Sequence, residues 1–296
     1  MSLRARLINR ALRLIEKPRL TRCQEPESLR RGFERNAWLW FHGPRGSRYE
    51  AAALGGVPGL RVSGPGAGGE RILLYFHGGG YVMGAPRTHR AMLARLSQLT
   101  TRVAYLPDYR KAPEHPFPAA VEDALAAYRA LIEQTPADRV VMGGDSAGGG
   151  LVLALLSEIC RIGLPQPGAT FVFSPLTDMT FSGASFQQNA QADVMLPTVR
   201  AKDMQQMYLA GHDPRDPRAS PLFANFKGAG PVWLSVGDTE ILLDDTRRMA
   251  GHLTQEGVSV KMTVEHDLPH VWPIFQRLMP EADATLRALA DWLNSR

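Results

Sequence analysis

The chain has 296 residues, and 44% of them are hydrophobic, which is enough to build one large domain with a sizeable core. No run of 18 or more apolar residues occurs, so the sequence indicates no membrane-spanning helix. The net charge of +5 comes from arginines scattered along the chain, without a nucleic-acid-binding motif. We therefore expect neither a nucleic-acid partner nor stable membrane insertion.

The first segment, from Met1 to Ile15, predicts an amphipathic helix. At 100° per residue its aliphatic residues cover about half of the circumference, and Arg6, Arg10 and Arg13 lie opposite. Charges interrupt the apolar residues, so the segment does not read as a signal peptide. We expect this helix to dock on its own protein, and adsorption to a membrane surface is the alternative.

Beyond this helix, candidate strands alternate with helical segments. The strands are expected at residues 49–53, 59–62, 71–76, 102–106, 139–142, 170–173, 232–236 and 259–264. The helices are expected at residues 87–98, 119–135, 147–161, 244–255 and 281–294. This alternation predicts an α/β fold with a mostly parallel sheet. The first two strands have no helix between them, so they predict an antiparallel edge.

Two segments, 1–45 and 176–215, do not fit this alternation. The second is rich in flexible and aromatic side chains, which predict either an adaptable apolar pocket or ordinary packing. These side chains belong to Met179, Phe181, Phe186, Met195, Met204, Met207 and Tyr208. No internal repeat or linker divides the chain, so we expect one domain over residues 1–296. Its two cysteines, Cys23 and Cys160, predict no disulfide framework and fit a cytoplasmic location.

A turn of small residues, Gly143-Gly144-Asp145-Ser146-Ala147-Gly148, stands between a predicted strand and a predicted helix. This is the context of a nucleophile elbow, in which a serine on a sharp turn projects its Oγ from the top of a sheet. The following helix N-terminus favours developing negative charge. Glycine-rich turns of this kind also bind phosphates, so the turn alone leaves both interpretations open.

A second loop supplies candidate oxyanion donors. The predicted strand that ends at Phe76 runs directly into His77-Gly78-Gly79-Gly80. The N–H groups of Gly78 and Gly79 are expected to face an oxyanion together with that of Ala147, the residue after the serine. We expect His77 to support the loop structurally.

The base and the acid of an acyl-transfer site are expected after the last strands. His266 continues the final strand, whereas His270 lies in a loop before the last helix, where its imidazole can reach the serine. We therefore favour His270. For the acid, the loop after the strand ending at Val236 offers Asp238 and Glu240, with Asp244 and Asp245 placed to charge the next helix start.

Together these motifs resemble the bacterial hormone-sensitive lipase family of α/β-hydrolase esterases. The resemblance covers about residue 40 to the C-terminus, and it rests on His77–Gly80, Gly144–Gly148, YRKAPEHPFPAA at Tyr109–Ala120, SPLF at Ser220–Phe223 and PHVW at Pro269–Trp272. The family's acid motif is Gly-x-x-Asp-Pro-Leu-x-Asp. Here Glu240 occupies the position of the catalytic Asp, and some members similarly use Glu.

The resemblance implies an α/β-hydrolase fold with a mostly parallel eight-stranded sheet, flanked by helices and covered by a helical cap from residues 1–45 and 176–215. It implies a carboxylesterase acting on small-molecule esters with short acyl chains, without metal or cofactor. Ser146, Glu240 and His270 would form the triad, with Gly80, Asp145 and Tyr109 in support. A homodimer or higher homo-oligomer through the last strand and helix is also implied.

Two alternatives from other classes use the same fold. A ligand-binding receptor lacks the catalytic histidine, and the presence of His270 argues against it. An acyltransferase or amidase would use the same triad, and the fold does not distinguish these activities.

Overall fold

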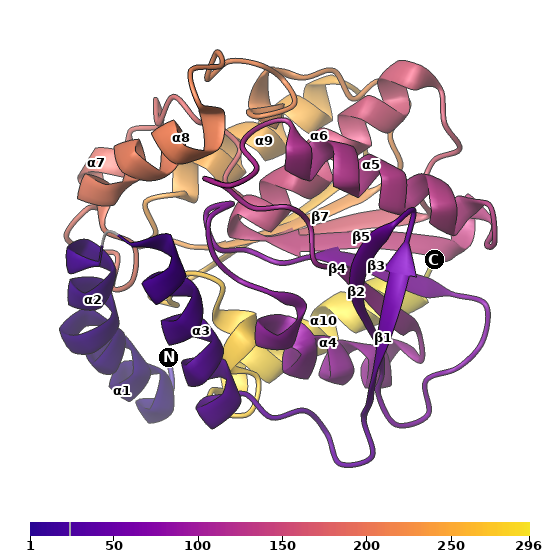
Figure 1. The fold of residues 1–296 in the computed structure, drawn as a ribbon. Coiled ribbons are helices and arrows are strands. Elements are labelled where there is room, and N and C mark those ends of the chain that lie inside the picture. Colours follow the sequence, from indigo (N-terminus) through magenta and orange to yellow (C-terminus); the bar gives the residue numbers. More distant parts are fainter. Residues whose placement is uncertain (24) are drawn as a thin grey trace.

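The computed structural model describes residues 1–23 and 25–296. Its centre is an eight-stranded sheet with the strand order β1-β2-β4-β3-β5-β6-β7-β8 (Figure 1). Strand β2 is antiparallel to both of its neighbours, and all other pairs are parallel. The α/β-hydrolase sheet with an antiparallel edge is thereby confirmed.

The strands lie where the apolar runs predicted them. Their bounds are Arg48–Leu54 (β1), Val57–Ser63 (β2), Ile72–Phe76 (β3), Val103–Pro107 (β4), Val140–Asp145 (β5), Ala169–Phe173 (β6), Val232–Gly237 (β7) and Val260–Glu265 (β8). The largest difference is at β5, which extends through Gly143 and Gly144 to Asp145. These glycines pair with Phe171 and Val172 of β6, so they continue the strand instead of opening the turn.

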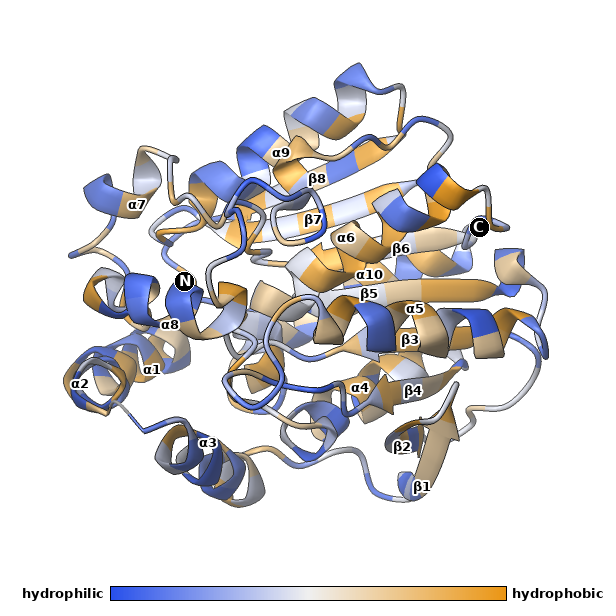
Figure 2. Cartoon of the chain, turned by 45° about the horizontal axis from the view of Figure 1, so that its top comes forward, coloured by the Kyte–Doolittle hydropathy of each residue, from blue (hydrophilic) through white to orange (hydrophobic). Residues whose placement is uncertain are grey.

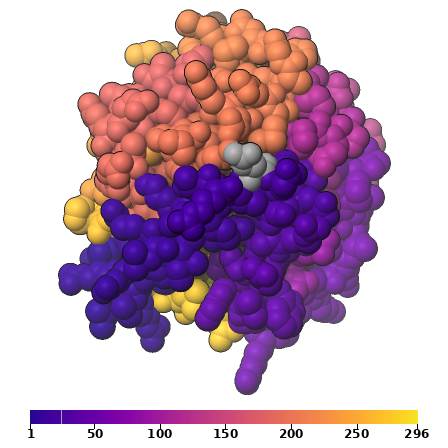
Figure 3. All heavy atoms as spheres, turned by 60° about the vertical axis from the view of Figure 1, so that its left-hand side comes forward, coloured from indigo at the N-terminus to yellow at the C-terminus, as the bar shows by residue number. Residues whose placement is uncertain are grey.

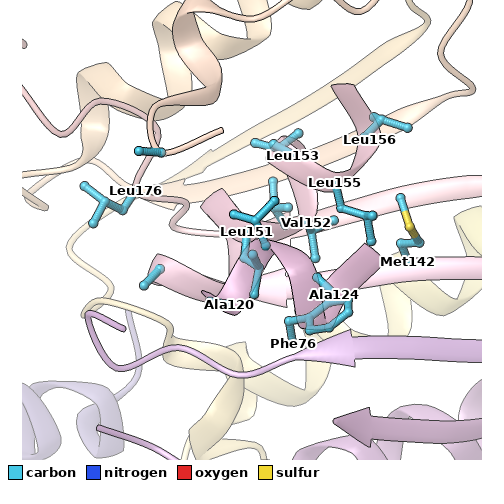
Figure 4. Close-up of a cluster of buried hydrophobic side chains, with 14 of the residues drawn as sticks. Phe76, Ala120, Ala124, Met142, Leu151, Val152, Leu153, Leu155, Leu156 and Leu176 are labelled. Carbon is cyan, nitrogen blue, oxygen red and sulfur yellow. The ribbon is translucent and has the colours of Figure 1, made fainter. Parts of the chain in front are cut away.

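Helices cover both faces of the sheet. On one face lie α4 (Pro86–Thr100) and α10 (Pro280–Asn294), and on the other lie α5 (Ala119–Ile132), α6 (Ser146–Ile162) and α9 (Leu243–Gln255). Alternate residues of β3 serve the two layers, because Leu73 and Tyr75 belong to the α4/α10 core whereas Leu74 and Phe76 belong to the α5/α6/α9 core. The side chains of α6 fill the centre of the second core (Figure 4). Hydrophobic residues accordingly gather along the central strands and α6 (Figure 2).

The N-terminal helix has one buried and one exposed face. Helix α1 (Leu3–Ala11) continues through a π-helical turn (Leu12–Glu16) into α2 (Lys17–Arg22), and α3 (Pro26–Trp40) follows. Ala5 and Asn9 are buried against the protein, and the Asn9 amide donates to the Asp267 carbonyl at 2.8 Å. The helix therefore docks on its own protein as expected, but Leu3 and Leu7 remain exposed on the other side.

Residues 176–215 lie beside the N-terminal helices. They contain α7 (Ser185–Gln188) and α8 (Ala201–Leu209), which share one side of the molecule with α1, α2 and α3 (Figures 1 and 3). Arg13 donates to the Ala192 carbonyl at 2.9 Å, and Lys17 donates to that of Asp193 at 2.6 Å. Within the described ranges, no helix has the length and apolar character needed to cross a membrane.

Candidate active site

Ser146 stands at the junction of β5 and α6. Its φ of 53° lies in the left-handed region, which is strained for a residue with a side chain. Such a sharp strand-to-helix turn lifts the serine out of the sheet. The small neighbours are required by crowding, because a Cβ on Gly144 would collide with the Gly148 carbonyl, and one on Gly148 with the Phe76 and His77 carbonyls.

His270 is held by Glu240 in a buried hydrogen-bonded pair. The side chains are 3% and 1% exposed, and His270 Nδ1 lies 2.6 Å from Glu240 Oε2. Because a carboxylate only accepts, Nδ1 carries the proton of the neutral imidazole, and the free lone pair of that form lies on Nε2. Burial alone would lower the pKa of His270, but the charge and hydrogen bond of Glu240 outweigh it and raise this pKa above the ordinary value of 6.5.

The second oxygen of Glu240 is also fully engaged. Oε1 accepts from the Gly237 N–H at 2.6 Å and from the Ser174 hydroxyl at 2.8 Å. Ser174 Oγ in turn accepts from the Val271 N–H at 3.2 Å. The loop that carries His270 and the loop that carries Glu240 are therefore tied together at the end of β6.

The competing residues form a separate pair at the surface. Asp238 Oδ2 lies 2.7 Å from His266 Nδ1, and the His266 side chain is 86% exposed. Asp238 also accepts from the Asp267 N–H at 2.8 Å. Neither residue lines the cavity that contains Ser146 and His270.

The glycine loop after β3 presents its N–H groups differently from the sequence prediction. The Gly78 N–H donates to Asp145 Oδ1 at 3.0 Å, so it is not free to face an oxyanion, contrary to the role predicted for this residue. Gly79 and Gly80, with φ of 121° and 62°, line the cavity. In the part of the chain that is described, the N–H groups of Gly79, Gly80 and Ala147 have no hydrogen-bond partner.

Asp145 anchors this loop from below the serine. Besides the Gly78 N–H, it accepts from the Tyr75 hydroxyl at 2.7 Å, and His89 Nε2 lies 3.2 Å away. Burial alone would raise the pKa of Asp145, but the charge and hydrogen bond of His89, with the Tyr75 hydroxyl, hold it below the usual value. Asp145 thus joins the nucleophile turn to the glycine loop as a buried carboxylate.

His77 and Tyr109 support the same loop. Their rings stack with centroids 4.4 Å apart, and the Tyr109 hydroxyl donates to the His77 carbonyl at 2.7 Å. His77 Nδ1 donates to the Gly78 carbonyl at 2.9 Å. Burial and the charges of Lys111 and His89 hold the pKa of His77 well below its ordinary value, so this imidazole is neutral.

A cavity of about 200 Å³ opens above Ser146 and His270. Its walls come largely from the two segments outside the α/β alternation. The N-terminal segment contributes Leu20, Leu29, Phe33 and Phe41, and residues 176–215 contribute Phe181, Phe186, Met195, Leu196, Met204 and Met207. By contrast, Met179 and Tyr208 are packed away in the core, where Tyr208 stacks on Tyr81. Pocket lining and ordinary packing are thus both present in the second segment.

Several residues that organise the site carried no signal in the sequence. Ser174 directly follows β6 and belongs to no recognisable motif, and His89 lies inside a helix. Asn189 and Asp193 bind the acid loop, where the Asn189 amide donates to the Glu240 carbonyl at 2.8 Å and Asp193 accepts from the Ile241 N–H at 3.0 Å. Only the folded chain brings these positions together.

Known proteins are similar to this chain in sequence. The family model described as alpha/beta hydrolase fold matches residues 73–274. An acetyl-hydrolase of Streptomyces hygroscopicus is 38% identical over 76% of this chain and 76% of its own length. An esterase of Acinetobacter venetianus is 32% identical over 82% of this chain and 80% of its own length.

Solved structures have the same fold over the full length of this chain. A crystal structure of an esterase from the bacterial hormone-sensitive lipase family has a TM-score of 0.94 at 36% identity, covering 100% of this chain and 98% of that one. A crystal structure of EstE5 soaked with ethyl alcohol has a TM-score of 0.95 at 37% identity, covering 100% of this chain and 99% of that one. This chain belongs to the α/β-hydrolase family, and within it to the bacterial hormone-sensitive lipase family of carboxylesterases.

Proposed function

We propose that this carboxylesterase hydrolyses short-chain acyl esters through a Ser146–His270–Glu240 triad. The observation that carries the proposal is the buried bond between His270 Nδ1 and Glu240 Oε2, which makes Nε2 the basic nitrogen of the neutral imidazole, beside the cavity that Ser146 lines. A free Nε2 lone pair is what a general base requires. The described residues show no hydrogen bond between Ser146 Oγ and His270, as is common before substrate tightens a site.

In the proposed reaction, Ser146 Oγ attacks the ester carbonyl while His270 Nε2 takes its proton. The carbonyl oxygen becomes an oxyanion, which the N–H groups of Gly79, Gly80 and Ala147 would bind. His270 then returns the proton to the leaving alkoxide, so alcohol departs and an acyl-serine remains. Water, deprotonated by His270, attacks the acyl-serine, and the acid is released with Ser146 regenerated.

The size and lining of the cavity support a preference for short acyl chains. At about 200 Å³ it is smaller than the roughly 300–1,000 Å³ typical of drug-sized ligand sites. Its apolar walls from residues 1–45 and 176–215 lead us to propose that these two segments act as the cap. A cap of this kind excludes water and fixes the depth of the acyl site.

The test is hydrolysis of p-nitrophenyl esters from acetate to palmitate. We expect kcat/KM to be highest for the short esters and to fall steeply for long ones. A phosphonate inhibitor should add to Ser146, as read by peptide mass spectrometry. Absence of turnover together with tight, reversible ester binding would instead support the receptor alternative, and transfer to an added alcohol or amine would support an acyltransferase.

A further inference from the structure

The N-terminal segment concentrates the positive charge of the chain. Residues 1–45 contain eleven Arg and Lys against four Glu, a net charge of +7, whereas residues 46–296 contain 23 against 25, a net charge of −2. The whole excess of positive charge therefore belongs to the helices that cover the active site. Figure 3 shows the indigo residues of this segment gathered on one face of the molecule.

Helix α1 exposes a second apolar stripe on the side opposite to its buried one. Leu3 and Leu7 are one turn apart and are 72% and 59% exposed. Leu14 and Ile15 follow in the π-helical turn at 64% and 68%. Large aliphatic side chains this exposed on one helix are not explained by packing on the protein.

Arginines flank this stripe without internal partners. Arg4, Arg6 and Arg10 are exposed, and none of them takes part in an ion pair within the described residues. Apolar residues bordered by arginines are typical of a helix that lies in a membrane–water interface. A helix face exposed only to water would not be expected to carry these exposed leucines.

A surface cavity continues this face. It has a volume of about 560 Å³ and is lined by Arg4, Arg45, Arg95 and Arg277, with Asp283 as its carboxylate. Asp283 is already engaged by Arg95 at 2.7 Å and by Arg287 at 2.8 Å. Arg95 is itself occupied by this pair, whereas none of Arg4, Arg45 and Arg277 takes part in an ion pair within the described residues. These three arginines suit the cavity to an anionic group such as a lipid phosphate.

Exposed aromatic side chains belong to the same N-terminal segment. Trp38 and Trp40, at the end of α3, are 70% and 60% exposed. Trp38 lines a hollow with His42, directly before the Gly43–Arg45 stretch that lines the arginine cavity. Tryptophan is enriched where proteins meet the headgroup level of a bilayer.

We propose that this face, formed by the α1 stripe, its arginines, the arginine cavity and the α3 tryptophans, binds an anionic lipid surface. A second copy of the chain is disfavoured as the occupant, because it would bring two +7 segments together. Binding here would place the lipid surface against the same helices whose inner side chains, including Leu20 and Phe33, wall the substrate cavity.

The test is flotation of the full-length protein with vesicles of phosphatidylcholine alone or mixed with anionic phosphatidylglycerol. We expect binding to the anionic vesicles, weakened by high salt, and little binding to the neutral ones. Arg6→Gln with Arg10→Gln should lower the partition coefficient by roughly 30-fold, taking about 1 kcal/mol for each arginine. Leu3→Asn with Leu7→Asn should lower it by roughly 10-fold or more.

Matched controls come from exposed residues outside this face. Arg129→Gln with Arg247→Gln and, separately, Met262→Gln should leave flotation unchanged. All variants should keep the wild-type Tm and the wild-type turnover of a water-soluble ester. Ester turnover tests the proposed esterase chemistry and flotation tests lipid binding, so failure of one proposal is distinguishable from failure of the other. The proposal is overturned if anionic vesicles do not float the protein, or if the control arginines matter equally. It is also overturned if the leucine variant changes only the oligomeric state.

Discussion

The Glu240→Gln substitution tests the proposed triad most directly. The carboxylate accepts from three donors, the Gly237 N–H, the Ser174 hydroxyl and His270 Nδ1. Glutamine offers one carbonyl oxygen and one amino group. Because the Gly237 N–H is fixed and only donates, the amide oxygen should stay on that side and the amino group should face His270.

This orientation forces His270 into the wrong tautomer. Nδ1 must then accept, so the proton moves to Nε2 and the base can no longer take the Ser146 proton. Turning the amide over would leave the buried Gly237 N–H unpaired, at a cost of about 1–3 kcal/mol. The orientation in which the amide oxygen faces His270 and keeps the proton on Nδ1 is thus populated in roughly one molecule in 5 to one in 150. Lost stabilisation of the imidazolium adds to this, so we expect kcat to fall by roughly 10²-fold to 10⁴-fold.

The assay is kcat on p-nitrophenyl acetate, with Asp238→Asn as the matched control. Asp238→Asn also converts a carboxylate that pairs with a histidine into an amide, because Asp238 Oδ2 lies 2.7 Å from His266 Nδ1. This pair, however, lies at the surface and away from the cavity. We expect Asp238→Asn to retain kcat within a few-fold. The reasoning is refuted if Glu240→Gln stays near wild type while Asp238→Asn is the more impaired enzyme.

Four further outcomes are expected. Ser146→Ala should lower kcat by roughly 10⁶-fold and abolish phosphonate labelling, and labelling of another serine would contradict this. For wild type, kcat/KM should rise with pH through a midpoint above 6.5, because His270 must lose its proton to act as a base. Protonated His270 also adds to the free energy of unfolding, and this contribution should be lost as the pH rises through the same range. Asp145→Asn should lower kcat more than it changes KM, because it loosens the loop that carries Gly79. Deleting residues 1–35 should lower Tm by several degrees and shift the preferred acyl chain length, while acetate ester turnover persists. If Tm and the preferred chain length both stay at wild-type values, the N-terminal segment is not part of the cap.

Most of the fold was predictable because short local runs of apolar residues indicate where strands and helices alternate. The clearest departure is the end of β5, where Gly143 and Gly144 read as a turn. The structure pairs them with β6 and lays the Phe171 ring so close to Gly143 that a Cβ there would collide with it. Their small size serves a contact with another strand, and no local pattern reports such a contact.

The site was predictable only where chain order carried information. The order of strands placed the base and the acid in the loops after the last two strands, and the family resemblance selected Glu240 over Asp238. The structure brings His270 and Glu240 together. Three consecutive glycines, by contrast, look equivalent in a sequence. Which of their N–H groups is free depends on backbone torsions and on the carboxylate of Asp145, which binds the first of them. The prediction for Gly78 is therefore wrong, whereas the oxyanion role of Gly79 and Ala147 stays a prediction.

The covering helices and the catalytic loops are joined by a short chain of contacts. Lys17 donates to the carbonyl of Asp193, and the Asp193 carboxylate accepts from the N–H of Ile241, next to Glu240. Asn189 holds the Glu240 carbonyl from the same segment. A force on the N-terminal helices, including one from a bound lipid surface, would therefore reach the acid loop through two hydrogen bonds. The position of Glu240 is thus set partly by the proposed cap, which no motif around the acid indicates.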